Sequence, residues 1–190
     1  MRPVIVSIST SVDGCIADSD GSLDWSVPDA ELFRTYVDEL SGVDVYLLGR
    51  RLYETMLFWE TVEDDPELSA DECEWAKRWN ALPKVVFSTT LASVRGNARL
   101  LSGGLAEELA RLKSAPGDGE IHLGGAMLAA EAAAAGLIDE YRISVHPALI
   151  GGGTPLFPRD ERRTDLALLD SRVFGSGAVR SRYRVVREPG

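Results

Sequence analysis

The sequence has few of the residues on which metal sites and disulfide frameworks depend. It contains two cysteines and two histidines in 190 residues, and Cys15 and Cys73 do not have the spacing of metal ligands. Two cysteines without such spacing indicate reduced thiols in a cytosolic protein. Basic residues are also outnumbered, 20 against 30 acidic ones, so that the net charge is −10. This excess argues against nucleic acid or an anionic membrane as the main partner.

Long hydrophobic runs are absent as well. No segment approaches the roughly 18 apolar residues that a transmembrane helix needs. The first ten residues contain an apolar run of strand length, which is not typical of a signal peptide. We therefore expect a cytoplasmic protein. With 45% hydrophobic residues, the chain has enough apolar material for one domain with a substantial core, residues 1–190.

Segments typical of strands and helices alternate along most of the chain. Strands are expected at residues 4–9, 43–48, 84–88, 99–101 and 120–123. Helices are expected at residues 29–40, 50–57, 105–113 and 125–135, and the acidic residues 60–74 are expected to form a surface loop leading into a helix that ends near Leu82. Strands then dominate, at 138–146 and at 165–174 and 178–187, the last two joined by Gly175-Ser176-Gly177. This order predicts an α/β fold with a mostly parallel sheet and an antiparallel C-terminal hairpin.

Paired glycines follow one of the predicted strands. Gly124 and Gly125 connect the strand at 120–123 to the helix at 125–135. Glycines at such a turn let a ligand approach the backbone, and the N-terminus of a helix carries partial positive charge. A second glycine-rich loop, Gly151–Gly153, follows the strand at 138–146. Together these features indicate an α/β enzyme that binds a phosphate-bearing ligand such as a nucleotide.

Polar residues follow two other predicted strands. Arg50 and Arg51 come directly after Gly49, and Ser88 and Thr89 end the strand at 84–88. The carboxyl ends of strands meet at the edge where open α/β sheets bind ligands. An arginine pair there can hold a phosphate through charge-assisted hydrogen bonds. The alternative is that both arginines are exposed and pair with nearby acidic residues.

Four motifs are similar to those of one enzyme superfamily. Residues 7–17 are similar to Ser-Leu-Asp-Gly-x-Ile-Ala, and residues 48–55 to Met-Gly-Arg-x-Thr-Trp-Glu-Ser. His122–Ala126 matches a Gly-Gly cofactor turn, and residues 137–153 resemble the riboflavin reductase pattern. On these motifs the chain resembles the dihydrofolate reductase superfamily, in particular the reductase domain of bacterial riboflavin biosynthesis and its stand-alone relatives. The resemblance covers nearly the whole chain and implies a dihydrofolate reductase-like three-layer fold.

The resemblance also implies an NADPH site. Arg50 and Arg51, next to Gly49, would hold the adenosine 2′-phosphate, and Ser88 and Thr89 would lie near the adenine ribose. The pyrophosphate would be bound by Gly124, Gly125, Ala126 and Met127. The nicotinamide pocket would be lined by Ile16 and Ala17.

The substrate side rests on fewer residues. Residues 25–29 resemble a Trp-x-x-Pro-x-Asp motif, with one residue fewer before Asp29. Trp25 and Phe33 would contact the substrate, and Asp29, on the same helix face as Phe33, would be the proton donor. Alternatively, Asp29 caps the helix. Asp13 is a second polar candidate for the substrate, with turn formation before Gly14 as its alternative.

Two departures from the family separate this chain from its best-known members. The Gly-Arg-Arg segment and the acidic insertion 60–74 replace a Gly-x-Gly-Thr segment of the riboflavin reductases, and the zinc ligands of their fused deaminase are absent. We interpret His122 and His146 as structural. The prediction is a homodimeric, NADPH-dependent reductase of a pterin- or pyrimidine-like substrate. The alternatives are a nicotinamide-nucleotide-binding protein without turnover and a structural or interaction protein.

Overall fold

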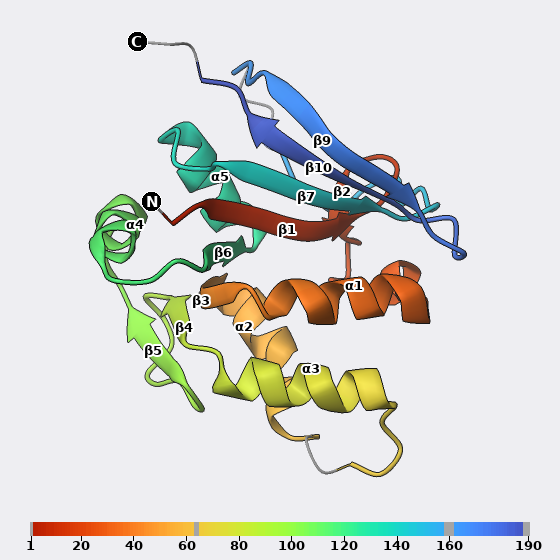
Figure 1. Ribbon diagram of the computed structural model, residues 1–190, viewed down its shortest axis with the longest axis horizontal. Helices are drawn as coiled ribbons and strands as arrows, with labels where there is room; N and C mark the ends of the chain where they lie inside the picture. The colour runs from red at the N-terminus through yellow and green to blue at the C-terminus, as the bar shows by residue number, and fades with distance from the viewer. Residues whose placement is uncertain (1, 63–64, 158–161, 188–190) are drawn as a thin grey trace.

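The protein is organised around an eight-stranded sheet. The computed structural model describes residues 2–62, 65–157 and 162–187. The strand order is β5-β4-β3-β6-β1-β7-β10-β9 (Figure 1). The strands that pair in parallel are β1 (Val4–Thr10), β3 (Val43–Gly49), β4 (Lys84–Phe87), β5 (Ala98–Leu101), β6 (Glu120–Gly124) and β7 (Glu140–Val145). β9 (Leu166–Val173) and β10 (Val179–Val185) are antiparallel. The predicted mixed α/β fold with an antiparallel C-terminal hairpin is confirmed.

Helices cover both faces of the sheet and complete three layers. One face carries α1 (Ala30–Leu40), α2 (Arg50–Met56) and α3 (Ala70–Ala81), and the other carries α4 (Leu105–Ser114) and α5 (Ala126–Ala134) (Figure 1). Two short 3-10 helices, η1 (Asp24–Ser26) and η2 (Leu57–Glu60), follow β2 and α2. None of the helices in the described ranges is long and apolar enough to cross a membrane.

The core follows the alternation of side chains along the strands. Leu47 of β3 faces the cluster beneath α4 and α5, whereas the next residue, Leu48, faces the cluster beneath α2 and α3. Both side chains are fully buried. Because successive strand residues point to opposite faces, a continuous apolar run such as residues 45–48 of β3 is typical of a strand buried on both sides.

Two short strands form a separate pair that the sequence did not indicate. β2 (Cys15–Ala17) and β8 (Thr154–Pro155) are antiparallel, with Cys15 opposite Pro155 and Ala17 opposite Thr154. Both lie in segments rich in glycine and aspartate, and two or three residues are too few to show periodicity. Pairing between positions so far apart in the chain leaves no local signal.

The acidic insertion differs in part from the prediction. Residues 63–64 lie outside the described residues, but α3 begins at Ala70, so the last five residues of the predicted loop are helical. Ser69 is the N-cap and forms a capping box with Glu72. Acidic residues in the first turn of a helix are stabilised by the helix dipole. The acidity of this part of the insertion therefore reflects the start of a helix.

Candidate functional site

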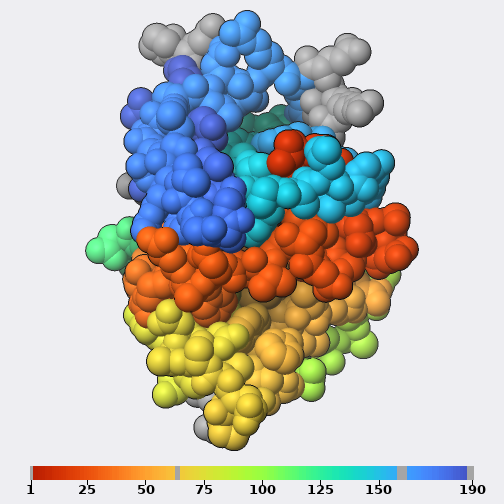
Figure 2. Space-filling model, turned by 90° about the vertical axis from the view of Figure 1, so that its right-hand side faces the viewer, coloured from red at the N-terminus to blue at the C-terminus, as the bar shows by residue number. Residues whose placement is uncertain are grey.

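The carboxyl ends of three neighbouring strands meet at one edge of the sheet. In the strand register, Leu48 lies opposite Gly124 and Gly49 lies opposite Phe87. A Cβ atom placed on Gly125 would be 3.8 Å from the backbone nitrogen of Gly49. The turns after β3, β4 and β6 therefore lie side by side, as the predicted topology requires. Figure 2 shows the molecule from the side toward which β1 runs in Figure 1.

The two glycines of the β6–α5 turn are needed for different reasons. Gly125 has a φ of 101°, a left-handed conformation that favours glycine. Gly124 is buried, and a Cβ atom there would lie 2.4 Å from Cδ2 of Leu52 and 2.9 Å from Cε1 of Tyr46. The missing side chain of Gly124 thus makes room for Leu52 and Tyr46, and the approach of a ligand to this glycine stays a prediction.

The turn opens into α5 with free backbone donors. Gly125 is the N-cap residue, and the first intrahelical bond runs from the N–H of Ala129 to the carbonyl of Gly125. The N–H groups of the first turn, including those of Ala126 and Met127, have no partner within the helix. Met127 is 86% exposed, so its side chain does not cover this end of α5. The arrangement can accept an anion.

The two adjacent arginines have different surroundings. Arg50 donates from Nε to Glu54 at 2.8 Å and from Nη1 to Oγ1 of Thr90 at 2.8 Å. Arg51 is exposed and has no hydrogen-bond or ion-pair partner among the residues that the structure describes. Surface pairing, the alternative raised for both arginines, therefore applies to Arg50 alone. Arg51 keeps all its donors for a ligand.

The segment after β4 forms a turn. Oγ of Ser88 accepts hydrogen bonds from the N–H groups of Thr90, at 3.1 Å, and Leu91, at 3.0 Å. The Ser88 oxygen therefore closes the turn. Thr89 is exposed and lies at the same edge as Arg50 and Arg51. Of the two hydroxyl residues predicted near the ribose, Thr89 is the better placed to meet a ligand.

Ile16 and Ala17, predicted near the nicotinamide, lie in β2 and are half-buried. Asp13, just before them, is an exposed residue whose carboxylate accepts hydrogen bonds from Oγ of Ser11 and from the N–H groups of Ile150 and Gly151. These bonds lower the pKa of Asp13 to about 2. Its carboxylate is engaged by the protein, which favours the structural alternative, and a contact with the substrate stays a prediction.

Asp29 is the N-cap of α1. Its Oδ1 accepts from the N–H of Leu32 at 2.8 Å, and its Oδ2 accepts from the N–H of Ser176 in the β9–β10 turn at 2.7 Å. These two hydrogen bonds lower the pKa of Asp29 below its usual range. A carboxylate stabilised in its ionised form is a poor proton donor at neutral pH. The structure therefore favours the capping alternative over the catalytic role predicted for Asp29.

Trp25 and Phe33 belong to separate aromatic groups. Trp25, in η1, meets His146 edge-on with a centroid distance of 6.1 Å. Phe33, in α1, stacks on Trp59 at 6.0 Å and contacts Trp75 at 5.8 Å. The rings of Trp25 and Phe33 thus do not lie in one aromatic cluster. Trp75 also stacks on Trp79, which is buried.

His146 is a titratable side chain close to Trp25. It is 2% exposed, and its Nε2 lies 3.3 Å from Oγ of Ser9, which is 3.1 Å from the hydroxyl of Tyr36. Burial lowers the pKa of His146, and the charge of Asp29 opposes this shift. Its neutral, hydrogen-bonded state agrees with a structural histidine. Its position beside Trp25 had no signal in the sequence because the two residues are far apart in the chain.

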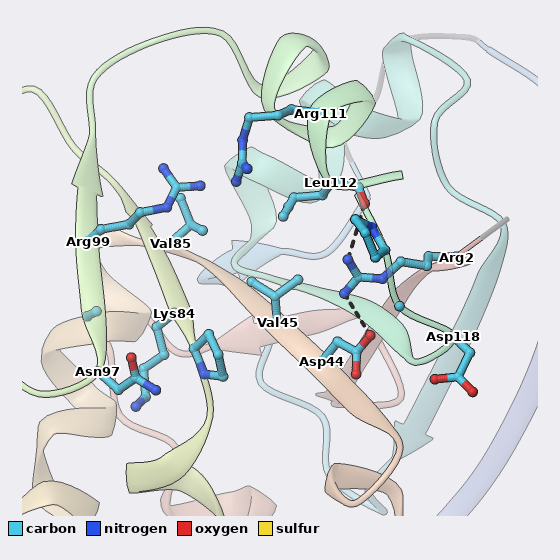
Figure 3. Close-up of a pocket in the computed structure, with 14 residues that line it drawn as sticks. Arg2, Asp44, Val45, Lys84, Val85, Asn97, Arg99, Arg111, Leu112 and Asp118 are labelled. Atoms are coloured by element: carbon cyan, nitrogen blue, oxygen red, sulfur yellow. Dashed lines mark hydrogen bonds and ion pairs between the residues drawn. The ribbon is translucent and has the colours of Figure 1, made fainter. Parts of the chain in front are cut away.

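A surface hollow lies at the opposite edge of the sheet. It encloses about 530 Å³ and is lined by the amino ends of β4 and β5 and the end of α4 (Figure 3). Its cations are paired: Arg2 with Asp44 at 3.0 Å, and Arg99 and Arg111 both with Glu108. None of the residues predicted to bind cofactor or substrate lines it. We therefore do not place the functional site there.

Comparisons with known proteins agree with this fold. The uncharacterized protein YyaP of Bacillus subtilis is 31% identical over 182 residues, which covers 96% of this chain and 94% of YyaP. A Shewanella sp. PV-4 protein provisionally named for riboflavin biosynthesis has a TM-score of 0.78 and 29% identity, with 98% of this chain and 100% of that chain covered. Dihydrofolate reductase of Enterococcus faecalis, solved with NADP(H), has a TM-score of 0.63 at 15% identity, with 96% of both chains covered. The model of the RibD C-terminal domain matches residues 2–180, and the chain belongs to this family.

Proposed function

We propose that the protein is an NADPH-dependent reductase of a small heterocyclic substrate. The proposal rests on two features that occur at one edge of the sheet. Arg51 has no partner among the described residues, and the first N–H groups of α5 are open. These are two separate anion-binding features, and NADPH carries two separate phosphate groups. Membership of the RibD C-terminal domain family and the fold shared with an NADP(H)-bound dihydrofolate reductase support the same assignment.

The residues at the edge fit this cofactor. Arg51 would hold the 2′-phosphate, because its guanidinium has no competing partner, and Arg50 would lie beside it, held by Glu54 and Thr90. The backbone donors of Ala126 and Met127 would bind the pyrophosphate. Ile16 and Ala17 would border the nicotinamide. When bound, the cofactor supplies the hydride, and the protein orients it and excludes water.

The substrate class follows from the family. Since the chain belongs to the RibD C-terminal domain family and resembles a protein named for riboflavin biosynthesis, a pyrimidine of the phosphoribosylamino-uracil type is the first candidate. A pterin such as dihydrofolate is the second, because the fold is shared with dihydrofolate reductase. Hydride would pass to a C=N or C=O bond of the ring. Trp25 and Phe33 are the aromatic residues available to contact such a ring.

One observation favours a different candidate, a nicotinamide-nucleotide-binding protein without turnover. The carboxylate expected to donate a proton, Asp29, caps α1 and is held in its ionised form. A reductase lacking a proton donor would depend on solvent for that proton. Such a protein would bind the nicotinamide nucleotide at the same site but would not catalyse a reduction.

A titration separates these possibilities. The purified protein is titrated with NADPH and, separately, with NADH, and the nucleotide fluorescence is followed. Binding of NADPH with a clear preference over NADH supports the cofactor assignment, and NADPH oxidation is then measured with pyrimidine and pterin substrates. Saturable oxidation with one of them identifies a reductase. Binding without oxidation across the panel favours the non-catalytic candidate, and no binding of either nucleotide contradicts both.

A further inference from the structure

Two loops that are far apart in the sequence join at the carboxyl edge. The N–H of Val12 donates to the carbonyl of Ala148 at 2.8 Å, and the N–H of Leu156 donates to the carbonyl of Gly14 at 2.9 Å. The β2–β8 pairing continues this contact. In Figure 2 the red N-terminal segment is surrounded by the cyan segment near residue 150. We call the joined segments 11–17 and 147–156 the loop clasp.

Asp13 is the polar centre of the loop clasp. Its Oδ1 accepts from Oγ of Ser11 at 2.6 Å and from the N–H of Ile150 at 3.1 Å, and its Oδ2 accepts from the N–H of Gly151 at 2.7 Å. Oδ1 alone bridges the two loops, but a second acceptor oxygen is needed to satisfy all three donors. Asparagine would offer one acceptor oxygen and one amide group that cannot accept.

Gly153 brings the two backbones into contact. It has a φ of 128°, and a Cβ atom there would lie 2.2 Å from the carbonyl oxygen of Ala17 and 2.9 Å from Cα of Asp18. Its neighbour Gly152 has no such restriction, since a Cβ atom there would meet nothing within 4 Å. The glycine requirement at position 153 therefore comes from the approach to Ala17.

The loop clasp lies next to the proposed cofactor site. β1 runs into the clasp at Thr10, and its neighbour β6 runs into the Gly124–Gly125 turn. We propose that Asp13 and Gly153 are positioning residues that hold Ile16 and Ala17 in place for the nicotinamide end of the cofactor. The inference rests on the proposed function and deepens it. It assigns the clasp to one end of the cofactor, while Arg51 and α5 serve the other.

The test uses two ligands that differ in the nicotinamide end. Asp13→Ala and Gly153→Ala are compared with matched controls, Asp20→Ala and Gly152→Ala, for binding of NADPH and of adenosine 2′,5′-bisphosphate. We expect the Kd for NADPH to rise about tenfold in the two clasp variants, as for the loss of one or two net hydrogen bonds. The Kd for the bisphosphate should stay within about twofold, because that ligand has no nicotinamide. Both controls should bind as the wild type does.

A second measurement reads the loop clasp without any ligand. Hydrogen exchange at the amides of Ile150 and Gly151 should accelerate in Asp13→Ala and remain unchanged in Asp20→Ala. Accelerated exchange with unchanged NADPH affinity in both clasp variants overturns the positioning role but leaves the proposed function intact. Equal losses for NADPH and the bisphosphate also overturn it, since the effect would then be global. A wild-type protein that does not bind NADPH refutes both.

Discussion

The two edges of the parallel sheet use charged residues in opposite ways. At the amino edge, Arg142 is buried, with its side chain 8% exposed, and contacts Glu39, Glu120 and Glu140. Arg180 adds a second contact to Glu39. At the carboxyl edge, Arg51 is exposed and has no partner in the part of the chain that the structure describes, and it lies next to a helix whose first N–H groups are open. The first arrangement satisfies its charges internally, and the second leaves them for a ligand.

This difference shows why the shape of a surface alone does not identify the site. Two hollows, of about 530 and 410 Å³, lie at the amino edge among paired charges. The second is bordered by the Glu39, Glu120, Arg142 and Arg180 network. The carboxyl edge has the donors that are unpaired among the described residues. Unsatisfied hydrogen-bonding capacity is therefore the better guide to a binding site in this molecule.

The largest expected effect is at the amino edge, from Arg142→Met. The substitution removes the cation that Glu39, Glu120 and Glu140 share in a mostly buried site. Arg180 still contacts Glu39, and Arg182 still contacts Glu140. Breaking a buried ion pair in this way typically costs about 3–5 kcal/mol of unfolding free energy. Chemical denaturation measures the change. NADPH binding by the remaining folded protein should be unaltered if the amino edge is purely structural.

Arg182→Met is the matched control for Arg142→Met. Arg182 contacts the same carboxylate, Glu140, but its side chain is 42% exposed. Loss of an exposed ion pair should cost less than about 1 kcal/mol. Similar losses for the two variants would mean that burial does not decide the stability of this network, and the contrast between the two edges would weaken.

The next effect is at the carboxyl edge and separates the two adjacent arginines. Arg51→Ala should weaken NADPH binding by about 1.5–3 kcal/mol, the value of a lost charge-assisted contact, with little change for NADH. Arg50→Ala should have a smaller effect on NADPH, because Arg50 is engaged by Glu54 and Thr90. Fluorescence titration of both variants with both nucleotides measures this. Equal losses for NADPH and NADH in Arg51→Ala would contradict the 2′-phosphate assignment.

The smallest effect concerns Asp29, which lies between the cofactor edge and the C-terminal hairpin. Asp29→Ala should lower the melting temperature, and Asp29→Ser should recover part of the loss, because serine is also a good N-cap. NADPH affinity should not change in either variant. If an NADPH oxidation activity is found, its survival in Asp29→Ser would confirm a capping role, and its loss in a stable Asp29→Ser protein would restore Asp29 as the proton donor.

The sequence predicted the fold better than the site, and particular residues show why. β3, β4 and β6 are buried apolar runs bounded by glycine or polar residues, so local pattern was sufficient to find them and their topology. β2 and β8 depend on hydrogen bonds between residues more than a hundred positions apart, which no local pattern contains. At Asp29 the same motif fits a catalytic acid and a helix cap, and only the N–H groups of Leu32 and Ser176 distinguish them. The hydrogen bond of Arg50 likewise depends on Thr90, which lies in the turn after another strand, β4.

The contact between Leu52 and Gly124 has a consequence for ligand length. Leu52 follows Arg51 in α2, and its side chain occupies the space that a side chain at Gly124 would fill. α2, the helix that carries Arg51, therefore packs directly against the turn that begins α5. The contact between Leu52 and this turn would fix the spacing between the two proposed phosphate positions. The site would thus select ligands by the distance between their two phosphate groups as well as by their charge.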